Sequence, residues 1–369
     1  MHPLSYKYFG VDFMQRFSAV IFVLFFYCLV FQDEISLFVK EALLICSGVV
    51  LPSLYVFIVL SKIMSKLIKQ PKKTSTFSKF ISSCLGISPI LLPVGILGLI
   101  GSAPSMSYAV GNMYKDGRIT KDEAERIACI SNNCSISFIL GVVSGIFGDK
   151  KVAIIIFLSN MLSVIIVYRL FFAMKHVQNT KSTAVCEIKE GFCEIVCDSI
   201  SSSASDSLTL CSYIVFFYTA ARCICSLSFL SAKPLMRAFI FGFFEMTGGV
   251  NSLNYIEGYG KILLACTFLS FCGLSVIFQV KSALSRFGLS SKKFIKAKIL
   301  SAFLSPVICV ILLFFVPVDR PCFSVFEYGI DSKILYFNAP VVANIFCILF
   351  IFFYIFGKVA KKHKKGSLK

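Results

Sequence analysis

The sequence predicts an all-α polytopic membrane protein with about eight transmembrane helices and two re-entrant helical hairpins in an inverted-topology repeat. Three observations support this class. Of the 369 residues, 57% are hydrophobic and 15% are charged, whereas soluble domains average about 45–50% apolar and about 25% charged residues. The apolar residues gather in runs close to the ~20 residues that a spanning helix needs. The 37 Lys and Arg residues lie mostly in short loops between those runs.

Eight apolar runs are expected to cross the membrane, taken in chain order. They are 17–31, 43–60, 127–148, 152–168, 208–230, 263–280, 299–318 and 339–357. Two further apolar segments are short or interrupted. The run 80–101 contains Pro89 and Pro93, and the run 238–244 is too short to cross alone.

The distribution of basic residues predicts how the chain is oriented. We place the N-terminus in the cytoplasm and let segments 81–115 and 234–258 each enter and leave on one side. Cytoplasmic segments then carry 28 of the 37 Lys and Arg residues and the opposite side carries 8, with Arg222 inside a span. This bias follows the positive-inside rule. A full crossing by either segment would invert the later loops and remove the bias, so we expect two re-entrant hairpins and two cytoplasmic termini.

This order divides the chain into five parts. They are a first span (1–36), a first repeat (37–175) with hairpin 81–115, a cytoplasmic linker (176–189), a second, inverted repeat (190–318) with hairpin 234–258, and a last span with a basic cytoplasmic tail (319–369). The acidic stripe in 190–206 is interpreted as an interfacial helix. The tail is expected to contact anionic lipid.

The first hairpin contains the stretch GLIGSAPSMSYAVGNMYKDGRITKDEAER, residues 98 to 126. Irregular backbone at membrane depth must be buried in protein or line a wet cavity. A helix that begins near Ser105 would aim its amide groups into the break, which suits an anion or a hydrogen-bonding solute. Thr120 and Glu123 have the spacing of a capping box that opens the next helix. The candidate solute-binding residues of this half are Ser102, Pro104, Ser105, Ser107, Asn112, Asn132 and Asn133.

The second half has a matching stretch, FFEMTGGVNSLNY, residues 243 to 255. Its candidate solute-binding residues are Glu245, Thr247 and Asn251. A carboxylate inside a membrane segment is costly and by default marks function, but a structural Arg222–Glu245 ion pair is an open alternative. For the Ser and Asn candidates the alternative is helix packing with interhelical hydrogen bonds.

Several functional classes are not expected. The sequence has no HExxH or GxSxG motif and only three His residues, so we expect no enzyme, no metal site and no cofactor. The 16 Cys residues are scattered, as is typical of small core side chains. The net charge of +18 is explained by topology, so nucleic acid is not an expected partner.

The stretch GSAPSMSYAVGNMYKDGRITKDEAER, followed by SNNCSISFILGVVSGIFG, resembles the YlbJ family of sporulation integral membrane proteins. These belong to the nucleoside-recognition or Gate-domain group. LPSLYVFIVLSKI and FGFFEMTGG fit the same group, and the resemblance covers about 37 to 320. Family members commonly have Gly-Tyr/Phe-Pro-x-Gly-Ala at the break. This chain has Gly101-Ser102-Ala103-Pro104-Ser105-Met106 there, without the aromatic residue and the second glycine.

The resemblance implies a Gate-like repeat in each half and a role in endospore formation, in cortex assembly, in a bacterial cell membrane or a sporulation-stage membrane. Together with the paired interruptions, it predicts a transporter or channel for a small solute or ion bound between two interrupted helices. The alternative is a non-transporting membrane scaffold that binds other sporulation membrane proteins. Membrane lipids are expected partners in either case.

Overall fold

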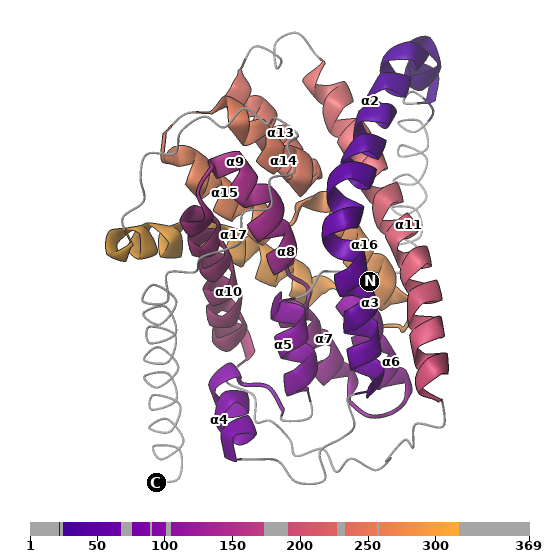
Figure 1. The fold of residues 1–369 in the computed structure, drawn as a ribbon, viewed down its shortest axis with the longest axis vertical. Coiled ribbons are helices and arrows are strands. Elements are labelled where there is room, and N and C mark those ends of the chain that lie inside the picture. The colour runs from indigo at the N-terminus through magenta and orange to yellow at the C-terminus, as the bar shows by residue number, and fades with distance from the viewer. Residues whose placement is uncertain are drawn as a thin grey trace, which may run out of the picture.

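The computed structural model describes residues 22, 25–67, 76–88, 91–100, 105–172, 191–226, 233–256 and 258–316 (Figure 1). Over these residues every secondary-structure element is a helix, which confirms the all-α class predicted from the sequence. The first predicted break, with Ser102 and Pro104, lies outside the described residues. So do the linker 176–189, the last predicted span and the basic tail.

Six helical segments within the described residues are long and apolar enough to cross a membrane. They are Gln32–Met64, Lys121–Phe147, Lys150–Phe171, Phe192–Cys225, Gly260–Ser285 and Lys292–Phe315. They coincide with the six inner crossings predicted from the sequence. Their outward faces carry exposed apolar side chains such as Leu44, Phe216 and Phe314. Such a surface suits hydrocarbon, and the chain is a multi-pass membrane protein.

The first half of the described chain contains eleven helical elements. They are α2 (Gln32–Ile45), η1 (Cys46–Val50), α3 (Leu51–Leu67), α4 (Thr76–Leu85), α5 (Leu92–Ile100), α6 (Ser105–Lys115), α7 (Lys121–Ser131), α8 with η2 (Ile136–Phe138 and Ile139–Val143), α9 (Ser144–Phe147) and α10 (Lys150–Phe172). α2, η1 and α3 follow one another without a gap. Helix α7 begins with the predicted capping box, in which Thr120 and Glu123 bond each other's backbone amides.

The second half of the described chain contains seven helical elements. They are α11 (Phe192–Cys225), α13 (Pro234–Phe244), α14 (Met246–Ser252), η3 (Leu253–Tyr255), α15 (Gly260–Phe271), α16 (Gly273–Ser285) and α17 (Lys292–Phe315). α7 packs on α17, and α15 packs on α10. In each of these contacts, a helix of the first half packs against a helix of the second half. In Figure 1, α5, α6 and α7 lie in the lower half of the molecule, and α13, α14 and α15 lie in the upper half.

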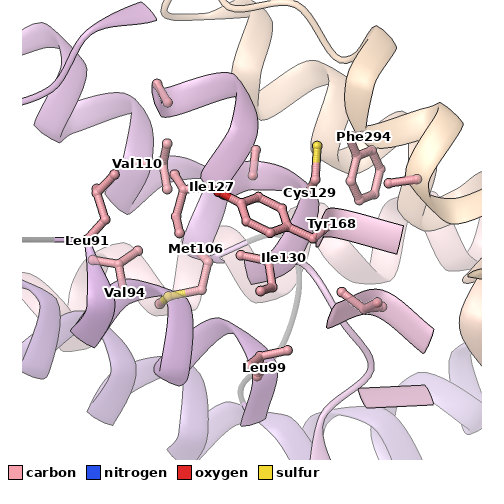
Figure 2. Close-up of a cluster of buried hydrophobic side chains, with 14 of the residues drawn as sticks. Leu91, Val94, Leu99, Met106, Val110, Ile127, Cys129, Ile130, Tyr168 and Phe294 are labelled. Atoms are coloured by element: carbon pink, nitrogen blue, oxygen red, sulfur yellow. The ribbon is translucent and has the colours of Figure 1, made fainter. Parts of the chain in front are cut away.

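A buried apolar cluster holds the lower group of helices together (Figure 2). Val94 of α5, Met106 of α6 and Ile127 of α7 lie in it beside Tyr168 of α10 and Phe294 of α17. The cluster therefore joins the short helices of the first half to a long helix of the second half. This packing fixes the position of the interruption that follows α7.

Helix α11 differs from the prediction. Residues 192–225 form one continuous helix of 34 residues, about 51 Å long at 1.5 Å per residue, and not a separate interfacial helix followed by a span. Two residues of the predicted acidic stripe bond α3: Asp198 lies 2.5 Å from Lys66, and Asp206 lies 2.7 Å from Lys62. These ion pairs hold the polar end of α11 against α3.

Candidate functional site

Three helices are interrupted close to the centre of the molecule. After α7, residues Asn132–Ser135 leave the helical conformation before α8 begins. Between α13 and α14, Glu245 is extended, with φ −146° and ψ 118°. Between α15 and α16, Cys272 adopts a left-handed conformation with φ 69°. Each interruption leaves helix-end amides and carbonyls that need partners.

In the first half, predicted site residues supply those partners. The Ser107 hydroxyl donates to Asn132 Oδ1 at 2.8 Å, and Asn132 Nδ2 donates to the Ala128 carbonyl at 2.8 Å. Asn133 Nδ2 donates to the carbonyls of Ile130 at 2.6 Å and Gly98 at 3.3 Å. The two asparagines therefore bond the end of α7 and tie it to α5 and α6.

In the second half, Glu245 is almost completely buried, with 1% of its surface exposed. Its Oε2 accepts a hydrogen bond from the Gly248 amide at 2.7 Å and so caps α14. A carboxylate at a helix N-terminus is stabilised by the amide dipoles there. The buried Thr247 lies next to it. The amides at this break are thus bonded by the chain's own carboxylate.

Not every predicted site residue lies in the buried region around the interruptions. Asn112 and Asn251 are exposed, and the Asn251 amide oxygen accepts from Asn254 at 3.4 Å. Ser105 is buried.

The suggested ion pair between Arg222 and Glu245 is wrong, because Arg222 pairs with Glu41 instead. Arg222 Nη2 lies 2.9 Å from Glu41 Oε1, and the Tyr218 hydroxyl donates to the same carboxylate at 3.3 Å. The Arg222 guanidinium also lies over the Phe38 ring, 4.6 Å from its centroid. Arg222 therefore joins α11 to α2, because its side chain projects from the α11 face that α2 covers. Glu245 was interpreted either as a functional carboxylate or as a structural partner of Arg222. The structural interpretation is now that Glu245 caps α14.

A cavity of about 30 Å³ lies where the interruptions meet. Its lining includes Asn133 and Cys134 of the first interruption, Glu245 and Thr247 of the second, and Gln279 of α16. A cavity needs roughly 10–15 Å³ to hold one water molecule, so this one has room for about two. Gln279 has 2% of its surface exposed, and neither of its amide atoms has a hydrogen-bond partner. Buried polar groups are nearly always paired, so Gln279 indicates that the cavity takes a polar occupant.

A second, smaller cavity of about 10 Å³ shares Asn133 and Cys134 with the first. Asn160 of α10, Ser270 of α15 and Lys298 of α17 also line it. Lys298 does not stand out in the sequence, because it directly precedes the apolar run 299–318 together with other basic residues. A signal was present: Phe294, Lys298, Ser301 and Ser305 have the three- and four-residue spacing of one helix face, and all four are buried.

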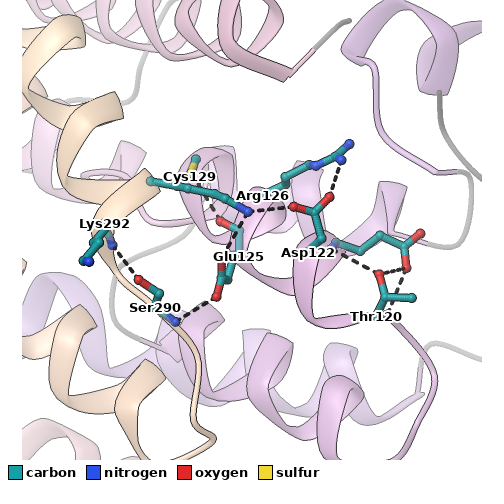
Figure 3. A network of polar contacts seen from close by, with 9 residues as sticks. Thr120, Asp122, Glu125, Arg126, Cys129, Ser290 and Lys292 are labelled. Carbon is teal, nitrogen blue, oxygen red and sulfur yellow. Dashed lines mark hydrogen bonds and ion pairs between the residues drawn. The ribbon is translucent and has the colours of Figure 1, made fainter. Parts of the chain in front are cut away.

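A polar network joins the two halves where the start of α7 meets the start of α17 (Figure 3). Lys293 Nζ lies 2.7 Å from Asp122 Oδ1 and 3.0 Å from Glu125 Oε2. The Ser290 amide donates to Glu125 Oε1 at 3.0 Å, and Arg126 pairs with Asp122. These contacts hold the start of α7 against the start of α17, so any opening at this end must separate them.

No family model, no curated protein and no solved structure matches this chain. Within the described residues, no group of three or more His, Cys, Asp or Glu side chains could hold a metal ion. The fold and the site together define a class: an all-α multi-pass membrane protein whose interrupted helices meet around small cavities with mainly apolar linings and a few polar side chains.

Proposed function

We propose that this protein is a transporter or channel for a small solute that binds between interrupted helices of two inverted repeats. The observation that carries the proposal is the 30 Å³ cavity, because both halves of the chain line it and each contributes residues from an interruption. Interrupted helices in corresponding positions of two repeats are the best structural pointer to a transport site.

Helix length supports a re-entrant hairpin in the second half. α13 has 11 residues and ends at the extended Glu245, so it spans about 17 Å at 1.5 Å per residue. A hydrocarbon core of about 30 Å requires about 20 residues. The close contact of Gly242 with Gly249 further supports α13 and α14 as the two arms of one hairpin.

The orientation is part of the proposal. The 28-to-8 distribution of basic residues favours cytoplasmic termini and places the Lys293 network on the cytoplasmic side. On the resemblance to the YlbJ and Gate-domain group, the protein acts in endospore formation in a bacterial cell membrane.

A cavity for about two water molecules is too small for most solutes, so transport requires a conformation that opens further. The small volume favours a second candidate function, a scaffold in which polar residues seal the core and the loops bind other membrane proteins. The two functions differ in one property: in a transporter, the centre becomes accessible to water, and in a scaffold it stays closed.

Cys134 offers a direct test because it lines both cavities. We suggest two variants in proteoliposomes, one that keeps only Cys134 and one that keeps only Cys266. Both cysteines are buried in the same apolar cluster, but Cys266 lines neither cavity. A membrane-impermeant maleimide is added from outside or enclosed inside.

If the protein is a transporter, Cys134 is modified from both sides while Cys266 is protected. Modification of Cys134 from one side only would favour a channel-like vestibule with one gate. If Cys134 reacts no faster than Cys266 from either side, the transport proposal is wrong and the scaffold remains.

A further inference from the structure

Lys298 is the most unusual buried group in the described part of the chain. Only 1% of its surface is exposed, in the interior of the spanning helix α17. Its Nζ donates to Asn133 Oδ1 at 2.9 Å and lies 5.7 Å from the centroid of the Phe294 ring. An ammonium group at this depth is costly unless it is paired, so it marks a functional position.

No carboxylate among the described residues lies within ion-pair distance of Lys298. The acidic groups of the neighbouring elements already have other partners. Asp122 and Glu125 of α7 bond Lys293, and Glu245 caps α14. The positive charge of Lys298 is therefore bonded by a neutral amide oxygen but not balanced by a negative group.

Asn160 also lines the small cavity beside Lys298, and its amide nitrogen is a donor with no hydrogen-bond partner. Asn160 is 9% exposed, and its Oδ1 accepts from the hydroxyls of Ser270 and of Ser305, the latter at 3.0 Å. Its Nδ2 has no hydrogen-bond partner. One turn along α17 from Lys298, the buried Ser301 hydroxyl is also unpartnered. The Lys298 ammonium and the unpartnered Asn160 Nδ2 are donors that line this cavity, so its best occupant is an acceptor.

We propose that Lys298 and Asn160 form an anion-binding subsite, which takes one oxygen of a carboxylate or phosphate group. The subsite volume of about 10 Å³ matches one water-sized atom. Because the larger cavity shares Asn133 and Cys134 with it, the rest of the bound molecule extends toward Glu245 and Gln279. The inference rests on the proposed function in one respect: it makes the transported solute an anion or a molecule with an anionic group.

The test uses the full chain in nanodiscs of neutral phosphatidylcholine, so that no anionic lipid competes. A thiol-reactive dye reports the thermal midpoint as buried cysteines become exposed. Sodium acetate, inorganic phosphate and neutral acetamide are titrated separately, with a bulky sulfonate salt holding the ionic strength constant. Acetate and acetamide are similar in shape and differ in charge, and phosphate distinguishes the two oxyanion sources.

Three variants are compared with the unmodified chain. Lys298→Gln removes the charge, and Asn160→Asp places a carboxylate beside the ammonium as an internal counter-ion. Lys296→Gln is the matched control, because Lys296 is exposed two residues away on the same helix.

We expect acetate or phosphate, but not acetamide, to raise the midpoint saturably in the unmodified chain and in Lys296→Gln. The apparent affinity should fall at least tenfold in Lys298→Gln. Asn160→Asp should have a higher midpoint without added anion and no response to it. The proposal is overturned if neither anion raises the midpoint, or if Lys298→Gln responds like the control. Should Lys298→Gln fail to fold, an unchanged anion response in Asn160→Asp overturns it equally.

The Cys134 experiment separates this inference from the proposed function. If Cys134 is labelled from both sides but no anion raises the midpoint, the transporter proposal stands and the proposal of an anionic solute is wrong. If an anion raises the midpoint but Cys134 is not labelled, the subsite holds a structural anion and the transporter proposal is wrong.

Discussion

The contact between α13 and α14 leads to the most direct structural prediction. A Cβ atom at Gly249 would lie 2.4 Å from Gly242 Cα and 2.6 Å from Gly242 N. Ordinary contacts at these atoms are 3.4–4 Å. Gly249→Ala therefore forces the two arms of the proposed hairpin apart by about 1 Å, because both opposing atoms are backbone and no side chain can rotate away.

The expected cost follows from this displacement. Inserting a methyl group into a well-packed interior costs about 1–3 kcal/mol, and a clash with backbone favours the upper part of this range. A loss of about 2–3 kcal/mol changes the folding equilibrium roughly 30- to 150-fold, since about 1.4 kcal/mol corresponds to a factor of ten. Moving α14 also disturbs its cap at Glu245, which adds to the loss.

The thermal midpoint in nanodiscs, followed with a thiol-reactive dye, measures the effect. Gly260→Ala is the control, because a Cβ there meets nothing within 4 Å and the backbone φ is not positive. We expect Gly249→Ala to lower the midpoint clearly and Gly260→Ala to leave it unchanged or slightly higher, since Ala favours helix over Gly. Equal midpoints for Gly249→Ala and the unmodified chain would refute the close packing of the two arms.

Two further predictions use the same measurement. Glu245→Ala removes the cap of α14 and should cost about 1–2 kcal/mol, whereas Glu245→Gln keeps an acceptor oxygen and should cost less; equal losses would argue against capping. Because Arg222 bonds Glu41, a double-mutant cycle between Arg222→Gln and Glu41→Gln should show coupling of about 0.5–3 kcal/mol. Stronger coupling of Arg222 with Glu245 than with Glu41 would contradict the observed pairing.

The helix order could be predicted from the sequence because its signals are local. Apolar run length located the six inner spans. Pro93 is the second residue of α5 and Pro234 is the first residue of α13, as expected in a first turn for a residue that fixes φ and lacks an amide donor. The capping box at Thr120 was also visible from four consecutive residues.

The site could be predicted only in part. Asn132, Asn133 and Glu245 were found because polar groups in apolar runs are conspicuous, and all three are buried near the centre. Asn112 and Asn251 were candidates of the same kind but are exposed, since the rotation of a helix about its axis decides which of its side chains face the protein interior. Lys298 was missed for the converse reason: it follows three other basic residues that belong to the helix end.

The sequence alone determined that this is an all-α membrane protein with an interruption near Glu245, because apolar run length and polar residues within apolar runs are local signals. The interruptions at Asn132–Ser135 and Cys272 fall inside runs that were predicted to cross the membrane unbroken. The tertiary structure decided which polar groups meet. The partner of Arg222, the capping role of Glu245 and the burial of Lys298 depend on how each helix is rotated about its axis and which helix packs against it. Those rotations are set by side-chain packing between segments far apart in the chain, such as Arg222 and Glu41, which are 181 residues apart, and the local sequence does not specify which segments meet.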